Sequence, residues 1–180
     1  TQPQVASVAH SKDQNFVVLR MAGRDISVGT DRGVFSRKGI DQGTMVLLEC
    51  AARPPSTGTF LDLGCGAGPI ALSLAAYSPQ AIVYAIDINE RAQKLTAANA
   101  QRNGMSNVIT CAPDEIDDHI RFDVLWSNPP IRIGKQELHK LLTTWLSRLS
   151  INGEAWLVIN RNLGSDSLAV WLIEQGYSVE

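Results

Sequence analysis

The chain has 180 residues, of which 44% are hydrophobic and 19% are charged, and its formal net charge is −2 at pH 7. This length and apolar content fit one soluble domain with a sizeable core. A run of about 18 apolar residues that could span a membrane is absent, as is a signal-peptide pattern at the start. The negative charge argues against tight non-specific binding to nucleic acid but not against a local basic patch.

The cysteines and histidines suggest neither a disulfide framework nor a metal site. Cys50, Cys65 and Cys111 are widely spaced, odd in number and without a Cys-x-x-Cys pair. The histidines have no partners at metal-ligand spacing. Free thiols fit a reducing, cytoplasmic setting best.

The first 53 residues are expected to precede the main sheet. Two strand-like runs flank a Met-Ala-Gly-Arg turn and predict a β-hairpin, and a glycine-containing loop follows it. Pro54-Pro55 then stops a short helix. The expected parts are a flexible leader (1–15), hairpin strands Phe16–Leu19 and Asp25–Val28, a loop Gly33–Gly43 and a helix Thr44–Ala52, the hairpin and loop region being 16–53 of a domain spanning 16–180.

From residue 54 onward, strands alternate with helices, which is typical of a parallel sheet covered on both faces. We therefore expect an α/β fold with a Rossmann-like, doubly wound, mostly parallel sheet over residues 54–180. The expected strands are Gly58–Leu63, Ala81–Ile86, Val108–Cys111, Phe122–Ser127, Glu154–Ile159 and a last one beginning at Tyr177–Val179. The expected helices are Pro69–Tyr77, a helix capped by Asn89 and ending at Arg102, Lys135–Leu149 and Ser165–Gln175.

A glycine-spaced turn follows the first of these strands, in Asp62-Leu-Gly64-Cys-Gly66-Ala-Gly68. Glycines let the backbone turn sharply and approach a ligand closely, since they carry no Cβ. A glycine-rich turn alone is a weak signal, because tight strand-to-helix connections without a ligand also use it. Whether this turn binds a ligand must be judged from the residues that follow the other strands.

Unusual residues lie where the expected parallel strands end, which is where open α/β sheets bind their ligands. Asp87 stands 19 positions beyond Gly68, a spacing that puts its carboxylate beside the ribose of a ligand held by the glycine loop. Alternatively, the Asp87 carboxylate only stabilises the N-terminus of the next helix. The ligand could be a dinucleotide or S-adenosylmethionine. The glycine spacing differs from the dinucleotide fingerprint, and Asp62 would repel a pyrophosphate but attract an ammonium. S-adenosylmethionine is therefore preferred.

Asn128-Pro129-Pro130-Ile131 follows the fourth expected strand and indicates the reaction. The prolines restrict the backbone, and Asn128 is pushed to an extended conformation. The Asn128 side-chain oxygen and the Pro129 carbonyl can accept the two hydrogens of a planar amino group. Such acceptors orient a poor nucleophile and stabilise the charge that develops on its nitrogen.

Together, Asp62–Gly68, Asp87 and Ser127-Asn128-Pro129-Pro130 resemble the motifs of class I S-adenosylmethionine-dependent methyltransferases that modify exocyclic amines. The stretch from Gly33 to Thr44 resembles more narrowly the methyltransferase small domain family of bacterial ribosomal RNA guanine-N2 methyltransferases. This resemblance implies S-adenosylmethionine as cofactor, S-adenosylhomocysteine as product, and RNA, as ribosomal RNA or a ribosomal subunit, as partner.

The resemblance also implies roles for individual residues, including a loop at Phe35 that closes over the cofactor and an adenine contact near Asp114. Asp114 could equally belong to a solvated acidic turn. The cofactor-binding residues expected on this basis are Phe35, Asp62, Gly64, Cys65, Gly66, Gly68, Asp87, Ile88, Asp114 and Asn128. The expected catalytic residues are Asn128, Pro129, Pro130 and Ile131.

Two features depart from the family pattern. Ile131 stands where many amino-methyltransferases have an aromatic residue, which disfavours adenine as substrate, and the chain stops at Glu180 before a further strand of the usual sheet. Basic residues near the expected site could contact phosphates. The candidates are Arg32, Arg37, Lys38, Arg132 and Lys135, whereas Lys140 is expected on a solvated face.

Alternatives remain open at this point. Adenine N6 or the side-chain amide of a protein glutamine could be the acceptor. A non-catalytic S-adenosylmethionine-binding module is a second class, although it would not need Asn128-Pro129-Pro130. A nicotinamide-dependent oxidoreductase is disfavoured by the glycine spacing and by the short chain.

Overall fold

The computed structural model describes residues 9–10, 16–30, 39–129, 134–159 and 164–180. Its elements alternate between strands and helices after residue 58, as expected. In chain order they are β1 (Ala9–His10), β2 (Phe16–Met21), β3 (Arg24–Gly29), α1 (Gln42–Cys50), β4 (Thr59–Leu63), α2 (Pro69–Tyr77), β5 (Ile82–Ile86), α3 (Glu90–Arg102), β6 (Val108–Cys111), the short 3-10 helix η1 (Pro113–Glu115), β7 (Phe122–Ser127), α4 (Lys135–Leu146), β8 (Leu149–Leu157) and α5 (Ser165–Glu174).

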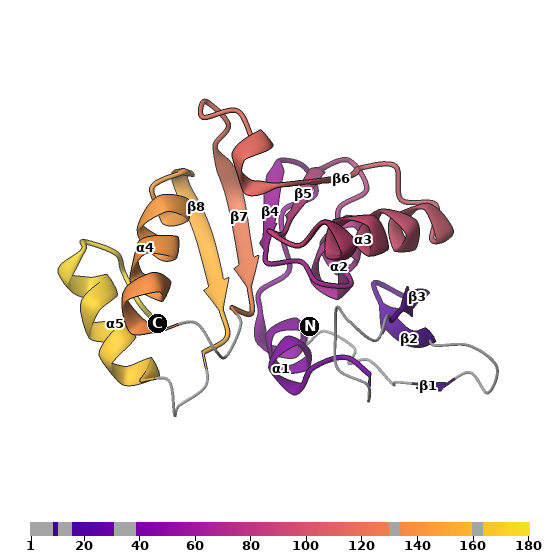
Figure 1. Cartoon of the computed structure of the whole chain (residues 1–180), viewed down its shortest axis with the longest axis horizontal. Coiled ribbons are helices and arrows are strands. Elements are labelled where there is room, and N and C mark those ends of the chain that lie inside the picture. Colours follow the sequence, from indigo (N-terminus) through magenta and orange to yellow (C-terminus); the bar gives the residue numbers. More distant parts are fainter. Residues whose placement is uncertain (1–8, 11–15, 31–38, 130–133, 160–163) are drawn as a thin grey trace.

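The main sheet has five strands in the order β6-β5-β4-β7-β8, and every neighbouring pair is parallel. Helices α2 and α3 lie on one side of it and α4 and α5 on the other (Figure 1). This confirms the Rossmann-like, doubly wound fold. The chain runs outward from β4 to β6 and then returns to β7 beside β4, so the strand order reverses between β4 and β7.

Each face of the sheet carries its own hydrophobic core, because successive side chains of a strand point to opposite faces. Phe60 and Trp126 pack with α1, α2 and the N-terminal strands. Leu61 and Leu125, one position away, pack with α4 and α5. Burial on both faces explains why β4 and β7 read as nearly continuous apolar runs.

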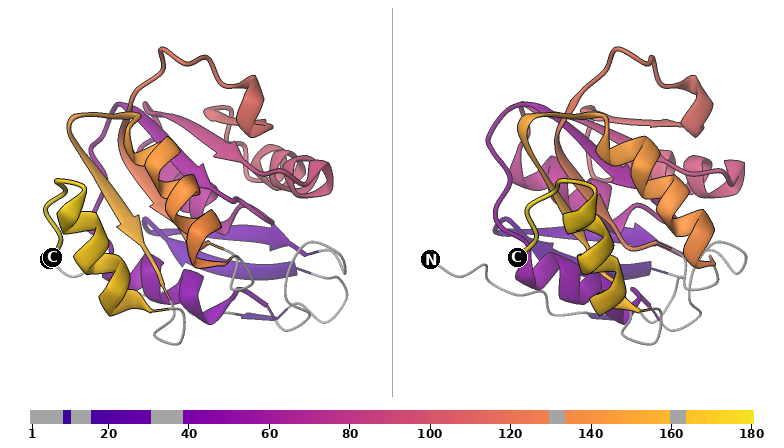
Figure 2. Two further views of the ribbon diagram at one scale, coloured as in Figure 1. Left: turned by 60° about the vertical axis from the view of Figure 1, so that its left-hand side comes forward. Right: turned by 90° about the vertical axis from the view of Figure 1, so that its left-hand side faces the viewer.

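The N-terminal strands form a separate antiparallel sheet in the order β1-β2-β3, visible beside the main sheet in Figure 2. Strands β2 and β3 form the predicted hairpin, with Met21 opposite Arg24. Its two turn residues, Ala22 and Gly23, have φ of 53° and 74°, the conformation of tight hairpin turns. Strand β1 lies within the stretch expected as a leader and pairs with Val17 and Val18.

Several expected boundaries are wrong. Helix α1 begins before Thr44 because Asp41 caps it, and it ends at Cys50, ahead of an extended Ala51. Helix α4 ends at Leu146 because the chain turns there to pair Leu149 with Phe122 in β8. Strand β8 therefore spans Leu149–Leu157 and not Glu154–Ile159. No strand forms at Tyr177–Val179 in the described segment 164–180.

Within the described ranges, no helix is both long and apolar enough to cross a membrane.

Candidate functional site

The glycine loop connects β4 to α2 at the carboxyl end of the sheet. Gly64, Gly66 and Gly68 have φ of 82°, 57° and 84°, values that side chains disfavour. A Cβ on Gly68 would also lie 2.7 Å from Thr96 Cγ2, so only glycine fits there. The Gly64 and Cys65 amides both donate to Ile86 O at 2.9 Å, which ties the loop to the end of β5.

Helix α3 supports the loop from beneath. Thr96 Oγ1 donates to Gly66 O at 3.0 Å, and Asn99 Nδ2 donates to Ala67 O at 2.9 Å. Both side chains are fully buried. The Cys65 thiol is buried against Thr96 as well, and this burial, more than the nearby carboxylates, raises its pKa. Cys65 is thus a packed side chain of the loop.

Asp62 is fully buried below the loop and not at a solvent-facing entrance. Its Oδ2 accepts a hydrogen bond from the Ala71 amide in the first turn of α2, at 2.9 Å. Its Oδ1 has no hydrogen-bond partner among the described residues. Burial raises the pKa of Asp62 to about 8, against the opposing effect of the Ala71 hydrogen bond. As far as the structure describes the chain, this carboxyl oxygen is buried without a hydrogen-bond partner.

Asp87 contacts both the glycine loop and the start of α3. Its Oδ2 accepts from the Gly66 amide at 3.0 Å, so it faces the glycine loop. Its Oδ1 accepts from the Asn89 amide at 2.9 Å, at the start of α3. Each carboxylate oxygen can accept a further hydrogen bond. Next to it, Ile88 is 91% exposed, which leaves an apolar side chain for a flat ligand to cover.

Asn128 lies at the end of β7, beside the glycine loop. Ser127 Oγ donates to Leu63 O at 2.7 Å, which fastens the end of β7 to the end of β4 where the strand order reverses. Asn128 is half-buried and Pro129 is buried. The Asn128 amide nitrogen donates to Asp41 Oδ2 at 2.7 Å and to Thr44 Oγ1 at 3.0 Å. The amide oxygen is therefore the end left to accept a ligand's hydrogens.

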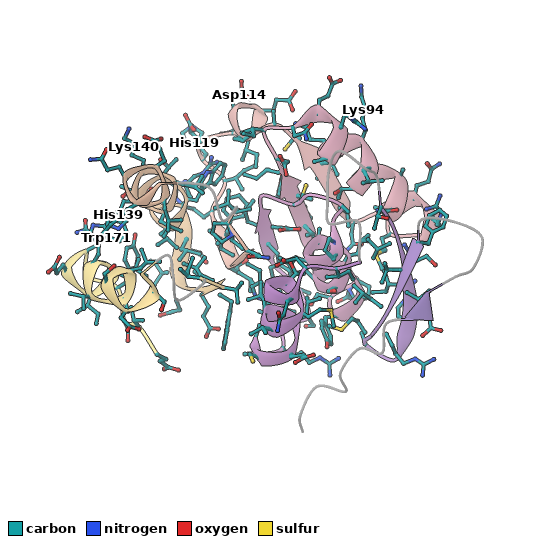
Figure 3. All side chains as sticks on the ribbon, turned by 60° about the horizontal axis from the view of Figure 1, so that its bottom comes forward. Lys94, Asp114, His119, His139, Lys140 and Trp171 are labelled. Atoms are coloured by element: carbon teal, nitrogen blue, oxygen red, sulfur yellow. The ribbon has the colours of Figure 1, made fainter. Side chains whose placement is uncertain are left out.

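The remaining predicted residues divide into three groups. Asp114 lies exposed in η1, after β6, and Lys135 is exposed at the start of α4. Lys140 is exposed and paired with Glu137, as expected of a solvated face, and Figure 3 shows it pointing away from the core. The predicted residues outside the described part of the chain are Arg32, Phe35, Arg37, Lys38, Pro130, Ile131 and Arg132.

The tryptophans of β7, α4 and α5 differ in burial. Trp126 in β7 and Trp145 in α4 are buried core residues. Trp171 is only partly buried, and its ring stacks on His139 with 3.9 Å between centroids (Figure 3). In the described ranges, no group of three or more His, Cys, Asp or Glu side chains is arranged to hold a metal ion.

The sequence did not reveal the polar residues that hold the site together from other elements. Asp41 and Thr44 contact Asn128 across 87 and 84 positions of sequence. In the sequence, Asp41 indicates only that a helix begins after it. Thr96 and Asn99 lie on the polar-looking helix α3, and only their burial marks them.

The comparisons with known proteins agree with this geometry. Residues 25–177 match the family described as "Methyltransferase small domain". YbxB of Bacillus subtilis, described as an uncharacterized protein, is 38% identical over 152 residues, covering 83% of this chain and 76% of that protein. Ribosomal RNA small subunit methyltransferase C of Cronobacter sakazakii is 33% identical over 140 residues, covering 76% of this chain but 41% of that enzyme.

Solved structures show the same fold. The N2 methyltransferase of 16S rRNA from T. thermophilus, in complex with AdoMet and guanosine, superposes with a TM-score of 0.69 at 22% identity, covering 92% of this chain and 45% of that chain. A precorrin-6y C5,15-methyltransferase from Geobacter metallireducens has a TM-score of 0.66 at 18% identity, covering 85% and 78%. The chain spans less than half the length of the ribosomal RNA methyltransferases that it matches.

Proposed function

The chain belongs to the methyltransferase small domain family of class I S-adenosylmethionine-dependent methyltransferases, and from this we propose that it methylates an exocyclic amine of RNA. Guanine N2 of ribosomal RNA is the proposed acceptor. The observation that carries the proposal is the junction of β4 and β7, where the Ser127–Leu63 hydrogen bond joins the end of the strand before Asn128 to the end of the strand before the glycine loop. The proposed cofactor loop and the proposed amine-holding motif thus share the point where α/β sheets bind ligands.

The described residues fit S-adenosylmethionine. The glycine loop offers close approach to backbone, Asp87 offers carboxylate oxygens to a ribose, and the exposed Ile88 offers an apolar surface to an adenine ring. Asp62 is buried below the loop, so its contact with the cofactor stays a prediction. Phe35, Cys65 and Asp114 remain predicted contacts.

The protein's part in the reaction is to hold and orient the acceptor amine. Asn128 Oδ1 and the Pro129 carbonyl accept its two hydrogens, which directs the nitrogen lone pair and stabilises the positive charge that develops. Pro130 and Ile131 lie outside the described residues, and their predicted roles are to restrict this backbone and to cover a face of the base. The cofactor supplies a methyl group on a sulfonium, so that a C–N bond forms, the C–S bond breaks and the amine loses one proton to solvent.

The choice of guanine N2 is supported by relatives. The Cronobacter sakazakii protein is named a ribosomal RNA small subunit methyltransferase, and the T. thermophilus structure contains guanosine. Adenine N6 and a protein glutamine amide use the same geometry and are the rival acceptors. A ribosomal RNA substrate also agrees with the cytoplasmic setting predicted from the cysteines.

The acceptor is tested by incubating the protein with labelled S-adenosylmethionine and either ribosomal subunits or free RNA, followed by nucleoside mass analysis. We expect N2-methylguanosine. N6-methyladenosine would replace the proposed acceptor with its nearest rival, and label only in protein would reject RNA as the substrate. Absence of saturable S-adenosylmethionine binding by calorimetry would reject the function altogether.

The role of Asn128 is tested by Asn128→Ala. Loss of one acceptor at a developing charge should lower kcat by about a hundredfold or more, while S-adenosylmethionine affinity changes little. Asn107→Ala is the matched control, because the Asn107 amide also donates two hydrogen bonds, to Ser78 O and Ala81 O, but lies before β6 at the opposite end of the sheet. An equal loss of affinity and kcat in Asn128→Ala would contradict the assigned role.

A further inference from the structure

One carboxylate oxygen joins the start of α1 to the end of β7. Asp41 Oδ2 accepts from the backbone amides of Gly43 at 2.9 Å and Thr44 at 3.3 Å, which caps α1. The same oxygen accepts from Asn128 Nδ2 at 2.7 Å, and Thr44 Oγ1 accepts from that nitrogen at 3.0 Å. Capping requires only the first two of these contacts.

The third and fourth contacts decide which way the Asn128 amide points. A side-chain amide has an acceptor end and a donor end, and only the acceptor end can hold a substrate amine. With both amide hydrogens given to Asp41 and Thr44, Asn128 Oδ1 faces away from α1. The reversed orientation would set the amide oxygen 2.7 Å from a carboxylate oxygen, which is repulsive.

The approach of α1 to Asn128 depends on a residue without a side chain. A Cβ on Gly43 would lie 2.9 Å from Val158 Cγ1 and 3.2 Å from Asn128 Nδ2. The first turn of α1 can therefore pack against the end of β7 only with glycine at this position. Thr44 is buried at the same junction, with 2% of its surface exposed.

We propose that Asp41 is a positioning residue for methyl transfer: it fixes the Asn128 amide so that its oxygen faces the acceptor amine, with Thr44 as the second anchor. This inference rests on the proposed function, since it concerns how that site is prepared. Asp41 acts through Asn128 and does not touch the reacting atoms.

Asp41→Ser separates positioning from capping. Serine caps helices as well as aspartate does. Its side chain is too short to reach Asn128, however, because the hydroxyl oxygen is attached directly to Cβ. We expect kcat to fall by about tenfold to a hundredfold, with S-adenosylmethionine affinity and Tm little changed. Asp41→Asn keeps an oxygen that can take the Oδ2 position, so it should recover much of the lost kcat. Thr44→Val should show a smaller loss.

Two comparisons exclude a general structural effect. Asp123→Ser removes another carboxylate that accepts from a backbone amide, that of Thr59, and from the Ser150 hydroxyl, near the start of β7. It should lower Tm while sparing kcat. In an Asn128→Ala background, Asp41→Ser should have no further effect on kcat, because the two residues act through one contact. Additive losses in the double variant would overturn the inference.

A spectroscopic readout keeps this inference separate from the proposed function. The Asn128 side-chain amide protons should give NMR signals that shift strongly in Asp41→Ser and less in Asp41→Asn. If these signals do not move in Asp41→Ser, Asp41 does not position Asn128, whatever the enzyme's activity. If they move but the unaltered protein methylates no substrate, the proposed function fails and the contact stands.

Discussion

Asp62 shows how a single buried carboxyl couples the site to pH. Burial raises its pKa to about 8 in the folded chain, with a smaller contribution from the charge of Asp87. An unfolded aspartate has a pKa of about 3.9. Between these values the folded chain binds a proton that the unfolded chain releases, so the free energy of unfolding falls as pH rises from about 4 to about 8.

Asp62→Asn should remove this pH dependence, because its amide oxygen can still accept from Ala71 but no longer titrates. The free energy of unfolding of the unaltered protein, measured in urea at pH 5 and pH 8, should decrease more than that of the variant. The difference is at most about 4 kcal/mol, from about 1.4 kcal/mol per pKa unit. Parallel pH profiles for the two proteins would show that Asp62 is ionised throughout this range.

At the residue scale, the sequence predicts the site residues that belong to a recognisable motif. It does not reveal the site residues whose partners are distant in sequence and become neighbours only in the fold. The motif-marked turn from Gly64 to Gly68 and the acid at Asp87 are joined by the hydrogen bond from the Gly66 amide to Asp87. Asp41 and Asn99 carry no comparable signal, because their partners lie 87 and 32 positions away. A hydrogen-bond partner so distant in sequence can be assigned to a polar side chain only when the order of the strands in the sheet is known.

At the element scale, α3 joins the N-terminal sheet to the glycine loop. The Asn99 amide donates to Gly29 O at 3.0 Å and accepts from Gly29 N at 2.9 Å, while also donating to Ala67 O. One turn later, the Asn103 amide accepts from Ser27 N and donates to Ser27 O. The two amides mimic the peptide groups of a neighbouring strand and pair with the edge of β3.

Asn99→Ala and Asn103→Ala form a matched pair that tests this link. Each removes two hydrogen bonds to β3, so both should lower Tm. Only Asn99→Ala also releases Ala67 O in the glycine loop, and we expect it alone to weaken S-adenosylhomocysteine binding, by about tenfold from one lost buried hydrogen bond. Calorimetry and thermal unfolding measure the two effects. Equal affinities in the two variants would show that cofactor binding does not depend on the Asn99–Ala67 hydrogen bond.

Element boundaries were predictable where capping residues mark them and unpredictable where pairing overrides periodicity. Helix α3 follows Asn89 and ends before Asn103-Gly104, as expected. Leu149 continues the helical spacing of α4 in the sequence, yet it pairs with Phe122. Asn152, with φ of 67°, lies inside β8, where the register with β7 is irregular. A turn signal within a strand cannot be distinguished in sequence from a turn before it.

At the scale of the whole molecule, the parallel sheet and its two covered faces follow from the alternation of strands and helices. That order places the residues that follow β4, β5 and β7 at the carboxyl end of the sheet. Charge does not provide a comparable guide to the partner, because the chain carries a net −2. We therefore expect any electrostatic attraction to RNA to come from a local group of basic residues.

RNA binding should accordingly depend only moderately on salt. Each phosphate contact to a single strand contributes about −0.7 to the slope of log affinity against log salt, so the five candidates Arg32, Arg37, Lys38, Arg132 and Lys135 allow about −3.5 at most. Lys135→Ala should make the slope less steep by about 0.7, the contribution of one phosphate contact. Lys140→Ala, on the same helix but paired with Glu137, should leave it unchanged. A steeper slope in the unaltered protein, or equal effects of the two variants, would place the phosphate contacts on another surface.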